Sequence, residues 1–553
     1  MRKWIGLLLF ATTAAAASRE PVVARHAMVA STSEIASRIG VEVMKKGGNA
    51  VDAAVAVALA MAVTWPAAGN LGGGGFMLIR KADGTSEAID YRERAPLAAT
   101  RDMYLDSLGN VVKGLSTDGY KAVGVPGTVA GLMLAHKRHG KLKWSELVEP
   151  ARKLAADGFV ISAFLETVLH EEDTLKKLKP WPESTRIFLR KTALGDRLTQ
   201  PELAATLARI QADPRDFYTG VTAKRIVADM RAHGGIITAE DLRTYEPAIR
   251  EPLRGSYRGH EFVVMPPPSS GAIAMIQMLK MLEHYDVGSM GWQSARYLHL
   301  MTEVMRRAFA DRAKYLGDPD FNKLPIRGLL APEYIEERRK TIDLEQASSG
   351  IEAGDPTPYE SDHTTHFAIV DDAGNMVSNT YTLNDWFGAG VTAKGTGVLL
   401  NNEMDDFTAH PGVPNEYQLM QSDANAIAPK KRPLSSSTPS FVEAPDGLMI
   451  IGSPGGSYIP GMVILGTLAF MEGRNAQEIV AAPRFHHQFS PDVLQFESDA
   501  LSPEERKALE DRGHKLREGT RKWGNVQVVT WNYKTGKVEA ASDPRGAGVG
   551  LVY

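Results

Sequence analysis

The stretch from residue 364 to residue 383, TTHFAIVDDAGNMVSNTYTL, carries a clear fold signal. Two runs rich in β-branched and aromatic residues flank residues 371–375, which include Asp, Gly and Asn, and this pattern is typical of a β-hairpin. Just upstream, residues 348–358 are polar, with few apolar side chains, and predict an exposed linker. A strand-rich region is therefore expected to begin directly behind a flexible connection.

Outward from this hairpin, the chain divides into a helix-rich middle and a strand-rich end. Helical patterning is predicted at residues 128–138, 143–157, 200–212, 222–232, 272–284 and 292–315. Further hairpins are predicted at residues 76–91, 253–264, 440–451 and 525–541. This combination is the arrangement of an α+β layered domain.

Two segments near the N-terminus predict unusually close packing. Residues 51–63, VDAAVAVALAMAV, are almost wholly apolar but too short for a membrane span, which favours a fully buried core helix. Residues 72–75 are four glycines that lead into a strand, where each glycine costs conformational entropy, so they predict very close approach of backbones. A phosphate loop is the alternative, but no Gly-Lys-Ser/Thr motif follows.

Residues 265–271, MPPPSSG, precede a predicted helix. The prolines fix a rigid extended entry, and Ser269 and Ser270 can cap the helix that follows. A stiff structural turn is the simpler interpretation of this motif.

Composition excludes several classes of function. The 553 residues include 63 Lys and Arg against 66 Asp and Glu, a net charge of -3, which offers no electrostatic footprint for nucleic acid or an anionic membrane. The chain contains no cysteine, so thiol nucleophiles, disulfides and thiolate metal sites are excluded. Covalent chemistry must then come from Ser, Thr, Lys, His or a carboxylate.

Residues 1–17 predict a secretory signal peptide. Met1, Arg2 and Lys3 form a positive start, a short apolar run follows, and small residues precede Ser18. The apolar run is shorter than the roughly 20 residues that span a bilayer, which favours removal over anchoring. We expect a periplasmic or secreted protein with no membrane span after signal removal.

The position of Thr364 permits a hydroxyl nucleophile. If the linker is cut before this residue, its hydroxyl and its new α-amino group belong to the same residue. An α-amine, with a reference pKa of about 7.7–8.0, can act as the base that activates the hydroxyl at neutral pH. By pattern alone, a Thr-Thr pair at the head of a strand is also ordinary β-propensity.

Motifs in the same order along almost the whole mature chain resemble those of the γ-glutamyltranspeptidases. Those in the C-terminal part are HTTH at 363–366, YTLN at 381–384, NNEMDDF at 401–407, KRPLSS at 431–436, GSPGGS at 452–457 and APRFHH at 482–487. Those upstream are GNLGGGGF at 69–76, YRE at 91–93 and MPPPSSG at 265–271. So many matches make coincidence very improbable.

The resemblance implies an N-terminal-nucleophile hydrolase with a four-layer αββα sandwich. Its precursor would cut itself between His363 and Thr364 into a large subunit, residues 18–363, and a small catalytic subunit, residues 364–553, which remain a heterodimer within one αββα unit. In the family the first Thr of the pair is the nucleophile, so Thr364 is carried over in preference to Thr365.

The remaining site residues follow from the same resemblance. Thr382 matches the Thr that assists the nucleophile, and Gly455 and Gly456 match the oxyanion-hole donors, where glycine suits an oxyanion that must come within about 2.7–3.1 Å. The matched substrate-binding residues are Arg92, Ser435 and Ser436 for an α-carboxylate, Asn384, Glu403 and Asp406 around an α-ammonium, and Tyr417 in a lid at about 411–429. By pattern alone, Glu403 and Asp406 are more often solvated turn charges.

The implied reaction is two-step acyl transfer from glutathione and other γ-glutamyl compounds to water or to an amino acid or dipeptide. No cofactor is expected, and no metal, because His366, His486 and His487 lack the spacing of a metal site on a helix. Two alternatives remain: a glutaryl-type β-lactam acylase of the same superfamily, and a catalytically inactive binding protein on this fold.

Overall fold

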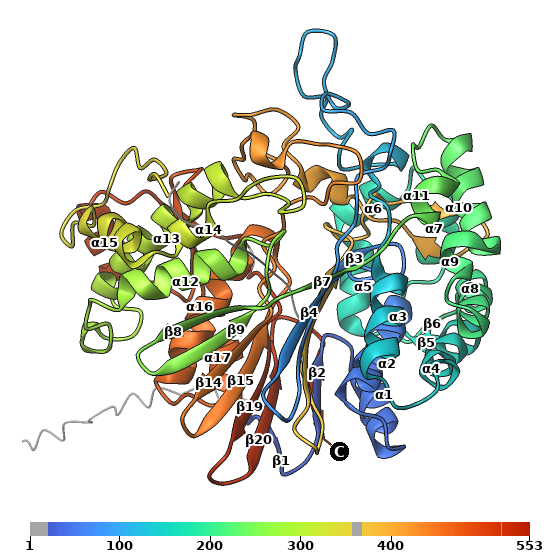
Figure 1. The fold of residues 1–553 in the computed structure, drawn as a ribbon, viewed down its shortest axis with the longest axis horizontal. Coiled ribbons are helices and arrows are strands. Elements are labelled where there is room, and N and C mark those ends of the chain that lie inside the picture. Colours follow the sequence, from blue (N-terminus) through green and yellow to red (C-terminus); the bar gives the residue numbers. More distant parts are fainter. Residues whose placement is uncertain (1–19, 357–367, 521, 553) are drawn as a thin grey trace, which may run out of the picture.

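The structure is a computed structural model that describes residues 20–356, 368–520 and 522–552. Two seven-stranded sheets lie face to face at its centre (Figure 1). The first has the order β1 (Val22–Ala24), β20 (Lys537–Ser542), β19 (Gln527–Asn532), β15 (Gly447–Gly452), β14 (Ser440–Ala444), β9 (His260–Val264) and β8 (Leu253–Tyr257). The second has the order β21 (Val549–Val552), β2 (Met28–Ser31), β10 (Ala368–Val370), β11 (Met376–Thr382), β3 (Gly74–Arg80), β4 (Ser86–Tyr91) and β7 (Ala248–Arg250).

Helices cover the outer face of each sheet. Beside the second sheet lie α1 (Glu34–Lys45), α2 (Ala50–Thr64), α3 (Thr128–His139), α4 (Trp144–Asp157), α5 (Ala163–His170), α6 (Glu172–Leu178), α7 (Pro182–Phe188), α8 (Pro201–Ala212), α9 (Asp216–Thr219), α10 (Val221–Ala232) and α11 (Ala239–Arg243). On the other side lie α12 (Gly271–Leu282), α13 (Ala295–Tyr315), α14 (Ile326–Leu329), α15 (Pro332–Lys340), α16 (Ile459–Met471), α17 (Ala476–Ala481) and α18 (Pro503–Asp511).

Short elements complete the fold. The minor strands are β5 (Phe159–Val160), β6 (Arg197–Leu198), β12 (Thr392–Ala393), β13 (Val398–Leu399), β16 (Phe485–His486), β17 (Leu494–Phe496) and β18 (Leu516–Glu518). The 3-10 turns are η1 (Tyr120–Ala122), η2 (Gly288–Met290), η3 (Glu403–Asp406), η4 (Asp423–Asn425) and η5 (Gly456–Tyr458).

Three apolar clusters define the layers. One lies between the two sheets and includes Phe76 and Leu78 from β3 and Phe441 and Ile450 from the opposite sheet. A second packs α1–α10 against the outer face of their sheet, and a third packs α12, α13, α16 and α17 against the other. Alternating side chains of the central strands β3, β14, β15 and β19 therefore pack in two different cores. The predicted four-layer αββα sandwich is confirmed.

The buried helix and the hairpins agree with the sequence. Every residue of α2 is buried, and Asn49 and Asp52 form a capping box at its start. The predicted major helices agree with the observed bounds to within three residues, and the hairpins form as β3–β4, β8–β9, β10–β11, β14–β15 and β19–β20. Both sheets combine strands from before and after residue 364.

The helix-capping prediction is wrong for Ser270, whereas the Ser269 oxygen accepts the N–H of Gly271, the first residue of α12, at 3.3 Å. Ser270 occupies the N-cap position of α12, but its side chain does not cap the helix. Its hydroxyl instead donates to the carbonyl of Ser435, 2.7 Å away. A long-range hydrogen bond has replaced the local one that the pattern suggested.

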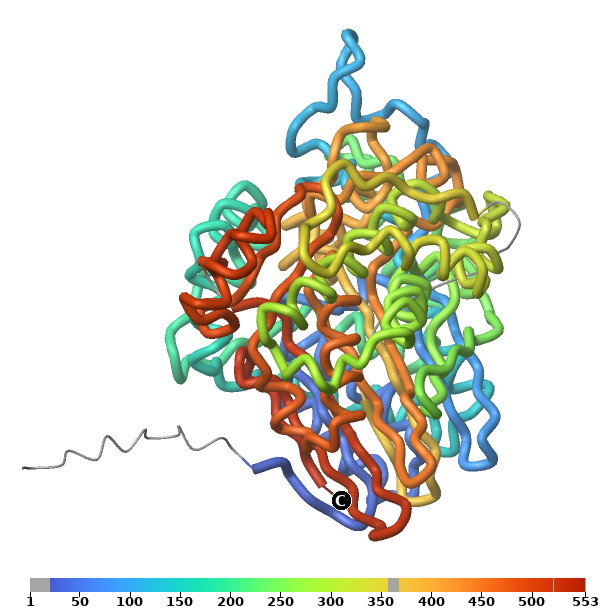
Figure 2. Tube along the Cα trace, turned by 90° about the vertical axis from the view of Figure 1, so that its left-hand side faces the viewer, coloured from blue at the N-terminus to red at the C-terminus, as the bar shows by residue number. Residues whose placement is uncertain are grey.

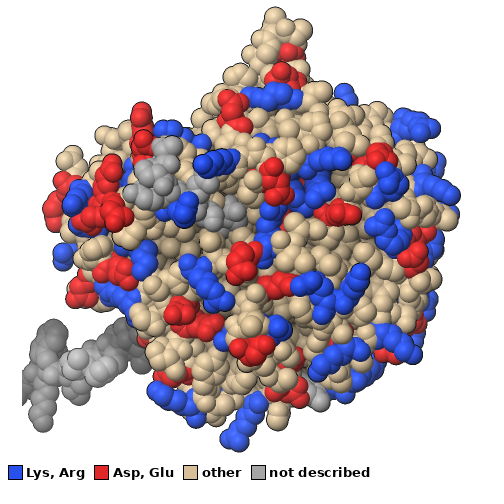
Figure 3. All heavy atoms as spheres, viewed as in Figure 1, with Lys and Arg blue, Asp and Glu red and all other residues tan. Residues whose placement is uncertain are grey.

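The surface has one prominent projection and mixed charge. The loop around residues 105–111 protrudes from one end of the molecule in both views (Figures 1 and 2), with Leu108 at 84% exposure. Figure 3 shows positive and negative side chains interspersed over the visible face. This distribution agrees with the nearly balanced charge of the sequence.

Candidate active site

The glycine run lets several chain segments converge at one end of β3 and β11. A Cβ on Gly73 would lie 1.9 Å from the carbonyl oxygen of Thr382, and one on Gly74 would lie 2.6 Å from Tyr91 O and from the Glu93 carboxylate. Real side chains do not tolerate such distances, so only glycine allows these backbones to meet. The predicted close approach is confirmed, and residues 72–75 enter a strand, unlike a phosphate loop.

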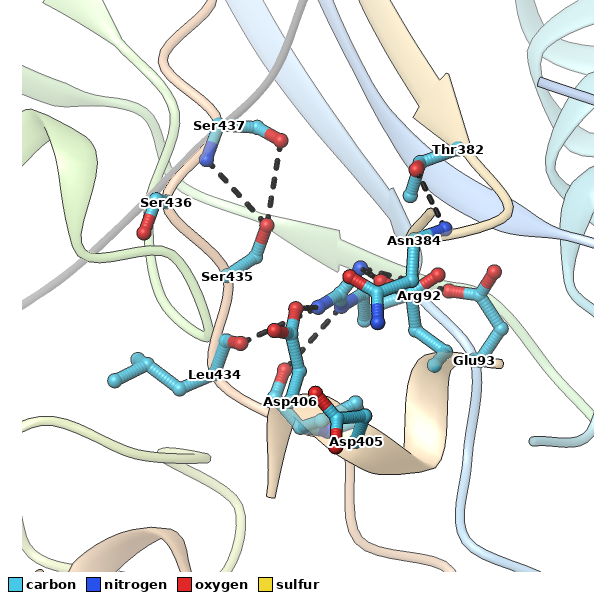
Figure 4. A network of polar contacts seen from close by, with 12 residues as sticks. Arg92, Glu93, Thr382, Asn384, Asp405, Asp406, Leu434, Ser435, Ser436 and Ser437 are labelled. Atoms are coloured by element: carbon cyan, nitrogen blue, oxygen red, sulfur yellow. Dashed lines mark hydrogen bonds and ion pairs between the residues drawn. The ribbon is translucent and has the colours of Figure 1, made fainter. Parts of the chain in front are cut away.

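Arg92 is the hub of the site (Figure 4). It follows β4 and is fully buried, and its Nη1 contacts the Glu403 carboxylate while its Nη2 donates to Asp406 Oδ2 at 2.5 Å. The remaining donors reach backbone carbonyls, Nε to Pro433 and Nη2 to Leu434. The fold thus brings together residues about 310 positions apart in sequence. In this structure the guanidinium fork contacts protein carboxylates on both sides.

A third carboxyl group joins this cluster. Glu93 Oε2 lies 3.8 Å from Arg92 Nη1, and burial raises the pKa of Glu93 to about 7 and that of Glu403 well above its usual value. Both oxygens of Glu93 and Oε2 of Glu403 are buried without a hydrogen-bond donor in the described part of the chain. A proton held on one carboxyl would supply a donor to its neighbour, and the raised pKa values favour a protonated carboxyl in this cluster.

Thr382, Asn384 and Tyr417 form one connected group. Thr382 ends β11, and its Oγ1 accepts the backbone N–H of Asn384 at 2.7 Å. Asn384 has a φ of 76°, a conformation that Asn tolerates better than most residues, and its side chain donates to Asn402 O. The Tyr417 hydroxyl donates to Asn384 O at 2.8 Å. The predicted lid residue therefore holds the turn that carries Asn384.

Gly456, which follows Gly455, lies against the ring of the same tyrosine. The φ values of Gly455 and Gly456 are 139° and 54°, and the two glycines lead into η5 and then α16, whose N-terminus contributes a partial positive charge. A Cβ on Gly456 would lie 2.6 Å from ring atoms of Tyr417. The lid, the Asn384 turn and the glycine pair consequently meet at one point.

Ser435 and Ser436 belong to a buried segment that pairs with the proline motif. Ser435 N–H donates to Pro268 O at 2.8 Å, and Ser270 N–H donates to Ser435 O at 2.9 Å. Ser435 is 3% and Ser436 is 6% exposed. The MPPPSSG motif therefore has a long-range role, because it fixes the backbone of the serine segment.

Sequence reasoning missed a residue that anchors the lid. Gln488 is buried, and its Nε2 donates to the carbonyls of Tyr417 and Gln418 at 3.1 Å. Its Oε1 contacts Nε2 of His486, which is itself buried. The only signal was its place directly after the APRFHH motif.

A second buried polar cluster was also unforeseen. His299, Glu303 and His514 place ligand-type atoms within 4.8 Å of one another. Glu303, however, is paired with Arg306 and Arg307, which supply positive charge of their own. The negative charge of Glu303 is therefore balanced by the positive charges of Arg306 and Arg307.

His363, Thr364, Thr365 and His366 lie outside the described residues, as do residues 1–17. The described part of the linker runs along α13: Ser348 N–H donates to Glu303, and Gly354 N–H donates to Asp311 at 3.1 Å. Residues 348–355 include both exposed and half-buried residues, and Pro356 is buried. The linker is thus fastened more firmly than its composition suggested.

The four-layer sandwich places the protein in the structural class of the N-terminal-nucleophile hydrolases. The sequence model of the gamma-glutamyltranspeptidase family matches residues 36–553, and the chain belongs to this family. It is 49% identical to a glutathione hydrolase proenzyme of Pseudomonas sp. (strain A14), over 91% of this chain and 88% of that protein. The predicted family and class of enzyme are confirmed.

Solved structures add two comparisons. A cephalosporin acylase from Bacillus halodurans superimposes with a TM-score of 0.87 at 27% identity, covering 99% of each chain. A γ-glutamyltranspeptidase chain from Helicobacter pylori matches with a TM-score of 0.58 at 41% identity, covering 60% of this chain and 95% of that one.

Among the described residues, none of the helices has the length and apolar character that a membrane crossing requires.

Proposed function

We propose that this protein is a self-processing γ-glutamyltransferase that acts on glutathione and related γ-glutamyl compounds. Cleavage between His363 and Thr364 would produce a large subunit, residues 18–363, and a small subunit, residues 364–553. The proenzyme name of the Pseudomonas relative supports this processing. So does the Helicobacter chain, which is almost fully covered yet matches only 60% of this chain, a share close to that of the large subunit.

The nucleophile is Thr364, with its own α-amino group as base. Its Oγ attacks the γ-carbonyl carbon while its proton passes to the α-amine, which then protonates the departing nitrogen as the amide C–N bond breaks. The product is a γ-glutamyl ester of Thr364. Water, or the amine of an amino acid or dipeptide, attacks this ester and restores the hydroxyl. Thr382 assists: its oxygen accepts Asn384 N–H, so its own proton remains for the nucleophile.

The buried Arg92–Glu403–Asp406 cluster, connected through Asn384 and Tyr417 to Gly456, is the observation that carries the proposal. A γ-glutamyl group carries an α-ammonium and an α-carboxylate remote from its reacting carbonyl. Glu403, Asp406 and Asn384 supply acceptors for the ammonium, and Arg92, Ser435 and Ser436 supply donors for the carboxylate. The backbone N–H groups of the two glycines would stabilise the oxyanion.

The second candidate is a glutaryl-type acylase, which the close superposition on a cephalosporin acylase favours. A glutaryl group has no α-ammonium. Burying Glu403 and Asp406 would then be unfavourable without a cationic partner beyond Arg92. The cluster of carboxyl groups therefore favours γ-glutamyl substrates.

We further propose periplasmic or extracellular localisation, on the strength of the predicted signal peptide. In such a compartment the enzyme would meet exported or external glutathione. Fractionation of cells that express the full chain, followed by N-terminal sequencing of the large subunit, tests both the location and a start near Ser18.

The decisive test is the intact mass and N-terminal sequence of the purified protein under denaturing conditions. We expect two chains, one of them beginning at Thr364, and turnover of a γ-glutamyl anilide. Thr364→Ala should remain one chain and lose turnover by at least about 10³-fold, whereas the matched control Thr365→Ala should still be cut. A wild-type chain that stays uncut and inert would instead support the inactive binding protein.

A further inference from the structure

A second buried arginine lies behind the serine segment. Arg312 is on α13 and is 2% exposed. Its Nε donates to Ser270 Oγ at 2.8 Å and its Nη2 donates to Ser436 Oγ at 2.9 Å, while Nη1 is buried without a hydrogen-bond partner. The mechanism proposed above gives this residue no role.

Arg312 differs from Arg92 in its electrostatic partners. In the part of the chain that the structure describes, Arg312 forms no ion pair, and the charge of Asp406 raises the pKa of its guanidinium. Burial lowers the pKa of Arg312 to about 10, yet the guanidinium remains charged at neutral pH. A buried cation whose hydrogen-bond partners are neutral hydroxyls retains an attraction for an anion.

The hydrogen bonds direct this attraction toward Ser436. Because the oxygen of Ser436 accepts an N–H of Arg312, its own proton remains to be donated to an acceptor. The Ser270 hydroxyl has no such free proton, because it accepts a hydrogen bond from Arg312 and donates one to Ser435 O. Arg312 thus connects the segment that contains Ser270 to the segment that contains Ser436, and it polarises the Ser436 hydroxyl.

A second positive charge is needed for the substrate carboxylate because the donors of Arg92 already contact protein acceptors. All three guanidinium nitrogens of Arg92 donate to protein acceptors, and two of these acceptors are carboxylates. An incoming α-carboxylate must therefore compete with Glu403 and Asp406 for Arg92. At Arg312 none of the described carboxylates forms an ion pair, so the competition is weaker.

We propose that Arg312 is a positioning residue for the α-carboxylate of the substrate, acting through Ser436 and through its unneutralised charge. The inference rests on the proposed function and assigns the site two cationic groups with different tasks. A merely structural Arg312 would fasten α13 to the serine segments and would influence all ligands alike.

Three competitive inhibitors of γ-glutamyl anilide turnover separate these roles. L-Glutamate has the α-carboxylate and the α-ammonium, glutarate lacks the ammonium, and 4-aminobutyrate lacks the α-carboxylate. In Arg312→Met, the inhibition constants of glutamate and glutarate should rise roughly 10- to 100-fold, which is the range for losing a charged hydrogen-bond partner. That of 4-aminobutyrate should change by less than about 3-fold. Inhibition constants do not depend on the fraction of active protein.

Two further variants keep the test interpretable. Ser270→Ala removes the fastening to the proline motif but leaves the charge and the Ser436 contact, so its inhibition constants should stay near those of the wild type. Arg312→Lys preserves the charge, and it should show the same selective pattern with smaller shifts even if Arg312→Met is not processed.

The outcomes distinguish this inference from the proposed function. Equal shifts for all three inhibitors, or shifts in Ser270→Ala as large as those in Arg312→Met, would overturn the role of Arg312 while leaving the transferase in place. A wild-type protein that is cut but does not turn over the anilide would count against the proposed function itself.

Discussion

Two buried arginines in one site have opposite surroundings. Arg92 contacts Glu403 and Asp406 and lies 3.8 Å from Glu93, whereas Arg312 contacts the hydroxyls of Ser270 and Ser436. The cost of removing each guanidinium from water is similar, but carboxylates offset it in the first case and neutral dipoles in the second. Among the described residues, carboxylates thus form ion pairs with Arg92, and none forms one with Arg312.

This difference indicates how one site can recognise a zwitterion. An ammonium group needs carboxylates that are held close together despite their mutual repulsion, and Arg92 makes that arrangement possible. A carboxylate needs a cation that is not paired with another carboxylate, and in our proposal Arg312 takes this role, since none of the described carboxylates forms an ion pair with it. The two ends of the substrate would therefore be bound by two electrostatic environments that meet near Asp406.

The largest effect that we expect from the difference between Arg92 and Arg312 is on the stability of the protein. Arg92→Met should destabilise the protein by about 3–5 kcal/mol, because it leaves several buried carboxyl groups uncompensated. Arg312→Met removes the same charge and volume but leaves only hydroxyl groups, and should cost about 1–2 kcal/mol. Thermal unfolding midpoints of the two variants at pH 8 would measure the difference. Equal midpoints would show that the two arginines carry equivalent roles.

A substitution on the acidic side should reverse the selectivity expected for Arg312. Asp406→Ala removes an acceptor for the α-ammonium, and we expect kcat/KM for a γ-glutamyl anilide to fall about 100-fold. A glutaryl anilide, which has no ammonium, should lose much less. Comparable losses on the two substrates would contradict the assignment of Asp406 and would strengthen the acylase alternative.

The smallest expected effect concerns the proton in the Arg92 cluster. Burial raises the pKa of Glu93 to about 7, above its ordinary value, so folding favours the protonated form. This contribution is fully present below the ordinary pKa and is lost as pH rises through about 7. Between pH 5 and pH 8 the wild type should therefore lose stability relative to Glu93→Gln, on the order of 2 kcal/mol. Thermal midpoints across this range provide the measurement.

A matched control is Glu149→Gln. The hydrogen bond from Arg152 lowers the pKa of Glu149, so this group stays charged throughout the same range and its replacement should shift the midpoint equally at every pH. If the curves of the wild type and Glu93→Gln also run parallel, the cluster holds no proton that titrates near neutral pH.

Much of the fold was predictable because its signals are local. The alternation in the hairpins, the apolar run that becomes α2 and the glycines at 72–75 each depend on the residues themselves. Family motifs also identified the residues that the structure gathers around Arg92. Ser270 shows the limit: a serine before a helix predicts a cap, and its actual partner, Ser435, is 165 residues away.

The sequence by itself determined the layered α+β class, the family and the chemical types available to the site, since these follow from periodicity, motif order and the absence of cysteine. Only the tertiary structure decided the charge state of the site. Whether the charge of an arginine is neutralised depends on which carboxylates are buried next to it. The sequence alone does not distinguish Arg92 from Arg312 in this respect. Their distances to Glu403, Asp406 and Ser436 arise from packing between segments that are far apart in the chain.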